Sequence, residues 1–151
     1  MSTDVLIFVE TRTLQNEPLI IENYTLISCK DCGNTRENFG HAVFIRESKL
    51  KNDPFYNNSY QNFINVSGLI VNNTAIIFVY NKSDAPFSNL ETMLKEVFEI
   101  TKQYMISNII IIGDFNIDLR CDTDQKTMSL ETLMKHLKLI HVTPLYHSST
   151  D

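Results

Sequence analysis

The chain has 151 residues and a mass of 17.4 kDa, which is the size of one domain. Hydrophobic residues make up 43% of it and charged residues 21%, so the composition is globular and excludes a disordered polar chain. No apolar run reaches the length of about 18 residues that a transmembrane helix requires, and no basic region precedes the first apolar stretch as in a signal peptide. We therefore expect one domain over residues 1–151, inside the cell in the nucleus or cytoplasm and without membrane contact.

The formal net charge of −5 and the isoelectric point near 5.3 restrict the partners of the chain. A protein that binds nucleic acid without regard to sequence usually has a basic surface and a domain pI above about 9. Here the basic residues between Lys30 and Lys51 are interleaved with acidic ones, which is typical of a solvated surface. An acidic excess still suits a site whose carboxylates surround a divalent cation, because the cation supplies the positive charge.

The chain has three cysteines, Cys29, Cys32 and Cys121, and an odd number without a secretion signal argues against a disulfide framework. Cys29 and Cys32 have the spacing of a zinc knuckle, but the sequence offers no second pair of ligands to complete four. The alternative is a turn that carries two free thiols, and the ligand count favours that alternative.

The first half of the chain predicts short strands. Residues 5–9 (VLIFV) form a continuously apolar run rich in β-branched and aromatic residues, which is typical of a strand buried on both faces. Residues 24–28 and 42–45 are shorter strand candidates. The polar segment 51–61 contains Pro54 and is expected to be a loop or an edge strand.

A hairpin is predicted over residues 63–71 and 74–80, because these two apolar runs flank the turn dipeptide Asn72-Asn73. Near the C-terminus, residues 140–143 predict the start of a further strand.

Two amphipathic helices are predicted. The first begins at Ser88, because Ser88 and Glu91 form the S-x-x-E pattern of a capping box. The second runs over about residues 128–139. The side chains expected on the inward faces follow helical spacing; they are Leu90, Met93, Leu94, Val97, Phe98, Thr101, Tyr104 and Met105 in the first helix, and Leu130, Leu133, Met134 and Leu137 in the second.

Residues 109–112 predict a second strand buried on both faces, which ends at Gly113-Asp114. Strands followed by a helix, a buried strand and another helix predict an α/β fold. In sheets of this kind the chemistry collects at the carboxyl ends of the strands. Glu10 ends the first buried strand and Asp114 ends the later one, so both become candidate site residues.

The tetrapeptide Gly113-Asp114-Phe115-Asn116 is the most informative one in the chain. Gly113 permits a tight exit from the strand, and Asp114 and Asn116, two residues apart in an extended stretch, project to the same side. A carboxylate and a carboxamide held together can position a water and hydrogen-bond a phosphoryl oxygen, while Phe115 points back into the core. The alternative is a plain turn, because Gly, Asp and Asn are common turn residues.

Two further residues lie at predicted strand ends. Mg²⁺ is typically held by one or two carboxylates and several waters, so Glu10 is a sufficient anchor for it; the alternative is a solvated charge. Tyr80 ends the strand over residues 74–80, where its hydroxyl can donate to a substrate phosphate. The alternative for Tyr80 is a half-buried aromatic.

Four segments resemble, in the same order, those of the endonuclease/exonuclease/phosphatase superfamily. They are LIFVET (residues 6–11), GHAVFI (40–45), IFVY (77–80) and IIIGDFN (110–116). The nearest members are the endonuclease domains of non-LTR retrotransposons and Helitron-type elements, whose ET strand end, G-x-A-V-x-I strand and GDFN turn look like these segments. The resemblance covers roughly residues 4–150.

The resemblance implies a four-layer α/β sandwich of two packed sheets flanked by helices. It implies metal-assisted hydrolysis of phosphodiesters with Mg²⁺ or Mn²⁺ as cofactor, and nucleic acid, DNA in the first place, as the ancestral substrate. Glu10 would be the metal ligand, and Asp114 would contact the attacking water or the leaving oxygen. Asn116 would orient the scissile phosphate, and Tyr80 would touch a phosphate oxygen.

Two parts of the family pattern have no counterpart here. The family's first strand, which ends in Asn, has no room before Glu10, and its last strands, with an Asp and a Ser-Asp-His motif, do not appear before residue 151. The resemblance thus implies a domain truncated at both ends. His147, in the terminal segment, is a candidate substitute base; the alternative, which its sequence context favours, is an ordinary surface or core histidine. Three functions stay open, namely an endonuclease-type hydrolase, an inactive fragment that serves as an interaction scaffold, and a phosphatase. Exposed strand edges in a truncated sheet also predict self-association.

Overall fold

The computed structural model describes residues 3–14, 17–30, 40–49, 55–60, 64–71, 73–121 and 123–142. They belong to two compact units, Met1–Asn116 and Ile117–Asp151. The first unit holds two β-sheets and one α-helix, and the second holds a single α-helix, in the described part of the chain. Within that part, none of the helices has both the length and the apolar character required to cross a membrane.

The first sheet has three antiparallel strands, β1 (Val5–Val9), β2 (Tyr24–Lys30) and β3 (His41–Arg46). Their order is β1-β3-β2, so β3 is the central strand. The three predicted strands are confirmed, and β2 and β3 are each longer than the sequence pattern indicated. The five residues of β1 pair one for one with β3, from Val5 opposite Ile45 to Val9 opposite His41.

The prediction that β1 is buried on both faces is wrong. Among the described strands β1 pairs with β3 alone, so it is an edge strand, in which Phe8 is 43% exposed and Val9 37% exposed. The strand buried on both faces is the central β3, whose first five residues are all buried. A continuously apolar run therefore identified a strand but not its place in the sheet.

The second sheet has the order β4-β5-β6-β7. β5 (Ile64–Val71) and β6 (Thr74–Asn81) form the predicted hairpin, and Asn73 in its turn has the left-handed φ of 61° that Asn tolerates. β4 (Tyr56–Tyr60) is an edge strand, as expected for that part of the polar segment. β7 (Asn108–Asp114) runs parallel to β6 at the other edge.

β7 is also less buried than predicted. Ile110 is 52% exposed and Ile112 is 47% exposed, because β7 is paired on one side only among the described strands. The prediction of a fully buried strand is therefore wrong here as well, although the strand itself is confirmed. Gly113 and Asp114 belong to β7 and do not lie beyond it.

Helix α1 (Phe87–Gln103) joins β6 to β7 and packs on β4 and β5. The predicted capping box is wrong, because Pro86 is the N-cap and no side chain caps the helix, so Ser88 lies inside it. The helix ends at Gln103, and for that reason Tyr104 and Met105 are exposed and do not extend the inward face. The other predicted inward residues are confirmed as buried; they are Leu90, Met93, Leu94, Val97, Phe98 and Thr101.

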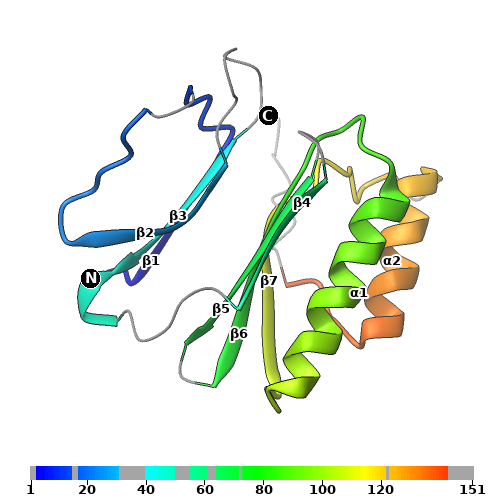
Figure 1. Cartoon of the computed structure of the whole chain (residues 1–151). Helices are drawn as coiled ribbons and strands as arrows, with labels where there is room; N and C mark the ends of the chain where they lie inside the picture. The colour runs from blue at the N-terminus through cyan, green and yellow to red at the C-terminus, as the bar shows by residue number, and fades with distance from the viewer. Residues whose placement is uncertain are drawn as a thin grey trace, which may run out of the picture. The chain divides into compact units, whose positions relative to one another are not determined.

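The two sheets pack face to face around a core of buried apolar side chains. Its buried members are Val43 and Ile45 from β3, Leu69 from β5 and Phe78 from β6, with Val5, Ile7, Ile27, Val71 and Ile76 packed against them. Figure 1 shows α1 along the second sheet, on the side away from the first sheet. The predicted α/β fold with two packed sheets is thus confirmed.

In the second unit, helix α2 (Gln125–Leu137) begins three residues earlier than predicted. Asp124 is its N-cap, because its side chain accepts hydrogen bonds from the backbone N–H groups of Lys126 and Thr127. The helix ends where Lys138 adopts a left-handed φ of 57°.

Of the residues predicted to face inward from α2, Leu130 and Leu133 are buried, whereas Met134 and Leu137 are only half-buried. Residues 140–142, where the last strand is predicted to begin, form no strand, and residue 143 lies outside the described residues.

Candidate functional site

Gly113 is paired with Val79 of β6 in the parallel register, with no room for a side chain between the two backbones. It has a φ of 151°, and a Cβ added there would lie 1.8 Å from the backbone oxygen of Val79. Only glycine fits at this distance, because the opposing atom is backbone and cannot rotate away. The next pair in the parallel register is Tyr80 with Asp114, so the close approach holds Asp114 beside the end of β6.

Asp114 and Asn116 form a compact turn. The backbone N–H of Asn116 donates to Asp114 Oδ1 at 2.9 Å, and its side-chain Nδ2 donates to Asp114 Oδ2 at 3.1 Å. Asn116 has a left-handed φ of 49°, which Asn adopts more readily than most residues. The structure therefore brings together the two side chains that sequence spacing placed on one side, and it leaves Asn116 exposed and Asp114 half-buried.

Asn81 is a third member of this site, and sequence reasoning missed it. Its Nδ2 donates to the backbone oxygen of Phe115 at 2.8 Å, and its own backbone oxygen accepts from Asn116 Nδ2 at 2.9 Å. Asn81 is 1% exposed. The available signal was a polar residue closing an otherwise apolar strand, but nothing in the sequence shows that this strand end meets the GDFN turn.

These contacts fix the orientation of the Asn116 carboxamide. Both hydrogens of Asn116 Nδ2 are engaged, one by Asn81 O and the other by Asp114 Oδ2. Since both partners are acceptors, the amide nitrogen must face them. The group that Asn116 turns away from these two partners is its Oδ1.

Tyr80 lies next to Asp114 in the parallel register and opposite Asn65 in the hairpin register. It is 2% exposed, so it is more buried than the half-buried aromatic that was the alternative for this position. Tyr80 therefore lies at the expected strand end, but most of its ring belongs to the core.

Glu10 follows β1 in the first sheet, with a left-handed φ of 51°. This conformation is uncommon for Glu and stores strain of about 1–3 kcal/mol, which is frequent at functional sites. The adjacent backbone N–H of Thr11 donates to Gly40 O at 3.3 Å and attaches the segment to β3. The Glu10 carboxylate is exposed, and an exposed hard oxygen donor fits a cation whose remaining ligands are waters.

A buried polar network connects the ends of the two sheets. His41 Nε2 and Ser28 Oγ are 2.9 Å apart, and Ser28 Oγ and Ser67 Oγ are 2.8 Å apart across the sheet interface. Ser67 Oγ also donates to Asn65 Oδ1 at 3.3 Å. His41 pairs with Val9, and Asn65 pairs with Tyr80. The network therefore joins His41, the register partner of Val9, to Asn65, the register partner of Tyr80.

The other ligands predicted from the sequence form no cluster within the described part of the chain. Among the described residues, no three His, Cys, Asp or Glu side chains come together as metal ligands. Cys29 is exposed at the end of β2, whereas Cys32 lies outside the described residues, so the zinc-knuckle spacing stays a prediction. His147 also lies outside the described residues.

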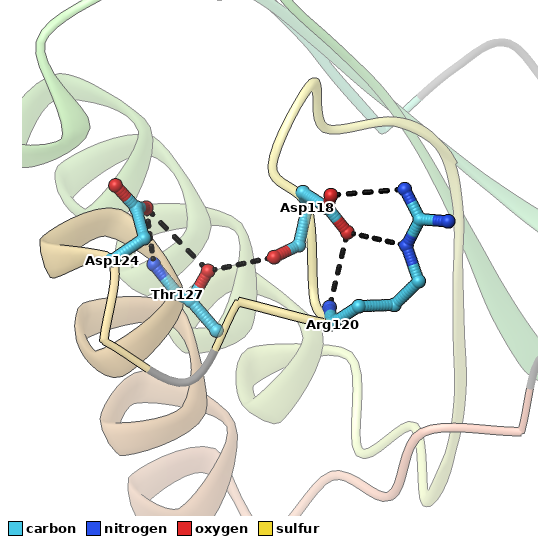
Figure 2. Close-up of polar contacts among 4 residues, drawn as sticks. All are labelled: Asp118, Arg120, Asp124 and Thr127. Carbon is cyan, nitrogen blue, oxygen red and sulfur yellow. Dashed lines mark hydrogen bonds and ion pairs between the residues drawn. The ribbon is translucent and has the colours of Figure 1, made fainter.

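The loop after the GDFN turn belongs to the second unit and contains an ion pair (Figure 2). Arg120 Nε donates to Asp118 Oδ1 at 2.9 Å, and Arg120 Nη2 donates to Asp118 Oδ2 at 3.0 Å. These hydrogen bonds lower the pKa of the Asp118 carboxyl from 3.8 to about 2. Thr127 Oγ1 donates to Asp118 O at 3.0 Å and so attaches the loop to the first turn of α2.

Comparison of the chain with models of known protein families and with curated protein sequences finds no match.

Proposed function

We propose that this chain is a metal-dependent phosphodiester hydrolase of endonuclease type, of mobile-element origin, with nucleic acid as its substrate. The observation that carries the proposal is the Asp114–Asn116 turn. A carboxylate and a carboxamide are held in one orientation there by Gly113 and Asn81. A polar pair held at a strand end by its neighbours is the kind of arrangement that positions water and a phosphoryl group.

The proposed roles follow from what each side chain offers. Glu10 would hold Mg²⁺ or Mn²⁺ with a single exposed carboxylate. When bound, the cation polarises the phosphate and stabilises the leaving oxyanion. Asp114 has two carboxylate oxygens beside the turn and accepts a hydrogen bond from the attacking water. Asn116 then orients the phosphate by turning one amide hydrogen from Asp114 Oδ2 to a phosphoryl oxygen.

A specific observation favours the second candidate, an inactive scaffold derived from such a domain. The only histidine of the first unit is His41, which is 3% exposed and bonded to Ser28. A buried histidine in a hydrogen-bonded network is poorly placed to exchange protons with a substrate. Under this candidate the Asp114–Asn116 turn is a structural strand end.

Hydrolysis of two substrates separates these candidates. Supercoiled plasmid and a sugar phosphate monoester are incubated with Mg²⁺ or Mn²⁺ and with wild type, Asp114→Ala, Asn116→Ala or His147→Ala. Asp84→Ala is the matched control, because Asp84 is an exposed aspartate of the same unit that makes only a 3.9 Å ion pair with Lys82.

We expect nicking by wild type and by Asp84→Ala, and its loss in Asp114→Ala and Asn116→Ala. Loss in His147→Ala as well would identify the base. Release of inorganic phosphate from the monoester without nicking would favour a phosphatase, and no hydrolysis of either substrate would favour the scaffold.

A further inference from the structure

Asn81 is buried in a way that its packing alone does not explain. It ends β6, a strand of mostly apolar residues, with 1% of its surface exposed. Its Oδ1 is buried and has no hydrogen-bond partner among the described residues. A buried acceptor without a partner is unfavourable for folding, and an apolar residue of similar size would avoid that penalty. The hydrogen bond that the amide nitrogen of the same side chain donates must therefore explain why an asparagine occupies this position.

The Asn81 amide nitrogen connects β6 to the turn that follows β7. Asn81 Nδ2 donates to Phe115 O at 2.8 Å, while Asn81 O accepts from Asn116 Nδ2 at 2.9 Å. Two hydrogen bonds of opposite direction thus join one residue to two consecutive residues of the turn. A pair of this kind restricts both the translation and the rotation of the turn.

The contacts of Asn81 extend to Asp114 through Asn116. Phe115 is the residue between the two polar side chains, so holding its carbonyl fixes the peptide that enters Asn116 in its left-handed conformation. Asn116 in turn donates twice to the carboxylate of Asp114. A shift of the Phe115 carbonyl would therefore move both of the polar groups that the proposed reaction uses.

We infer that Asn81 is a positioning residue, which orients the Asp114–Asn116 pair toward a phosphodiester without touching it. This inference rests on the proposed function. It distinguishes Asn81 from a residue that only stabilises the fold, because its side chain is expected to affect the geometry of the turn more than the stability of the protein.

The variant Asn81→Leu isolates the side-chain contact. Leucine has a similar size and removes the Nδ2 donor together with the buried Oδ1, which has no hydrogen-bond partner among the described residues. The backbone oxygen that accepts from Asn116 stays in place. Ile77→Val is the matched control, since Ile77 is fully buried in the same strand and its apolar side chain forms no hydrogen bond with the turn. Asn81→Ser, which is smaller and polar, serves as the second variant if Asn81→Leu does not fold.

Two readouts are needed. In ¹⁵N-labelled wild type we expect the side-chain NH₂ pair of Asn116 to be displaced from the resonances of exposed amides. It should move to their position in Asn81→Leu and stay displaced in Ile77→Val. For plasmid nicking we expect kcat to fall about two- to tenfold in Asn81→Leu, the range of one neutral hydrogen bond, with KM unchanged.

The inference is overturned if the Asn116 resonances of Asn81→Leu match those of wild type, or if Ile77→Val loses as much kcat as Asn81→Leu. It is also overturned if the resonances move while kcat does not. Absence of nicking in wild type would refute the proposed function separately, and the Asn116 resonances would then decide whether Asn81 positions the turn.

Discussion

Replacing Gly113 by alanine tests a position where the paired backbone of β6 leaves no room for a Cβ. The added Cβ would lie 1.8 Å from Val79 O, 2.7 Å from Val79 C and 2.8 Å from Val79 N. All three are backbone atoms of the paired strand β6, so relief requires that β6 and β7 separate. The φ of 151° adds strain, because side chains other than that of glycine rarely adopt it.

The expected loss of unfolding free energy can be worked from these two effects. Residues in a backbone region reserved for glycine cost about 1–3 kcal/mol, and insertion of a methyl group into a packed site costs about 1–3 kcal/mol more. The sum, about 2–6 kcal/mol, is a large part of the total stability of about 5–15 kcal/mol that a domain has. With a urea m-value of about 2 kcal/mol/M, the unfolding midpoint should fall by about 1 M or more.

Urea unfolding followed by circular dichroism measures this loss, and Gly68→Ala is the matched control. A Cβ at Gly68 would lie 2.6 Å from Phe55 Cζ, about as close as a Cβ at Gly113 would lie to Val79 C. The clashing atom at Gly68, however, belongs to a side chain that can rotate. We expect Gly68→Ala to cost about 1 kcal/mol or less. Equal midpoints for Gly113→Ala and Gly68→Ala would refute the account of the β6–β7 approach.

Three further predictions concern charge, metal and association. The Asp118 carboxyl should titrate near pH 2 by NMR and move toward 3.8 in Arg120→Ala; since its folded pKa is lowered, the ion pair's small contribution to stability is present above pH 3.8 and lost as the pH falls toward 2. Titration calorimetry should show weak Mn²⁺ binding that Glu10→Ala abolishes, and equal binding by both proteins would remove Glu10 as ligand. Size-exclusion chromatography should show oligomers of the wild type and monomers of Ile110→Lys or Ile112→Lys, because both exposed side chains lie on the edge strand β7. A sharp monomer peak of the wild type would contradict this expectation.

The strands and helices of this chain could be predicted from the sequence because their apolar periodicities are local. What periodicity did not supply is a strand's place in its sheet. The apolar runs of β1 and β7 predict strands buried on both faces, whereas both are edge strands among the described strands. A short apolar run has the same composition at an edge as at the centre, and the number of neighbours depends on the rest of the chain.

The helix starts show a competition between local signals. Ser88 and Glu91 match a capping box, yet Pro86 precedes them and already adopts the extended conformation of an N-cap, so the helix begins at Phe87. In α2 the Asp124 side chain provides the cap, so the helix begins three residues before the predicted start at residue 128. Which of two neighbouring residues, such as Pro86 and Ser88, becomes the N-cap of a helix depends on the path of the chain in the folded protein.

The candidate site was predictable only in part. Asp114 and Asn116 are two residues apart, and their contact follows from local geometry. Asn81 is 35 residues from Asn116 and meets it only because β6 and β7 are parallel neighbours joined through α1. The His41–Ser28–Ser67 network is likewise nonlocal, since it depends on the packing of two sheets.

The central claim is that the Asp114–Asn116 turn serves hydrolysis of phosphodiesters, and one ratio tests it most directly. This is the initial rate of plasmid nicking in Mn²⁺ by wild type divided by that of Asp114→Ala, with both proteins purified identically and shown to be folded. A positioned group that handles a proton in the reaction is worth about 10²–10⁴-fold, so the account predicts a ratio of at least about 100. A ratio near one, or a wild type that does not nick at all, would contradict it.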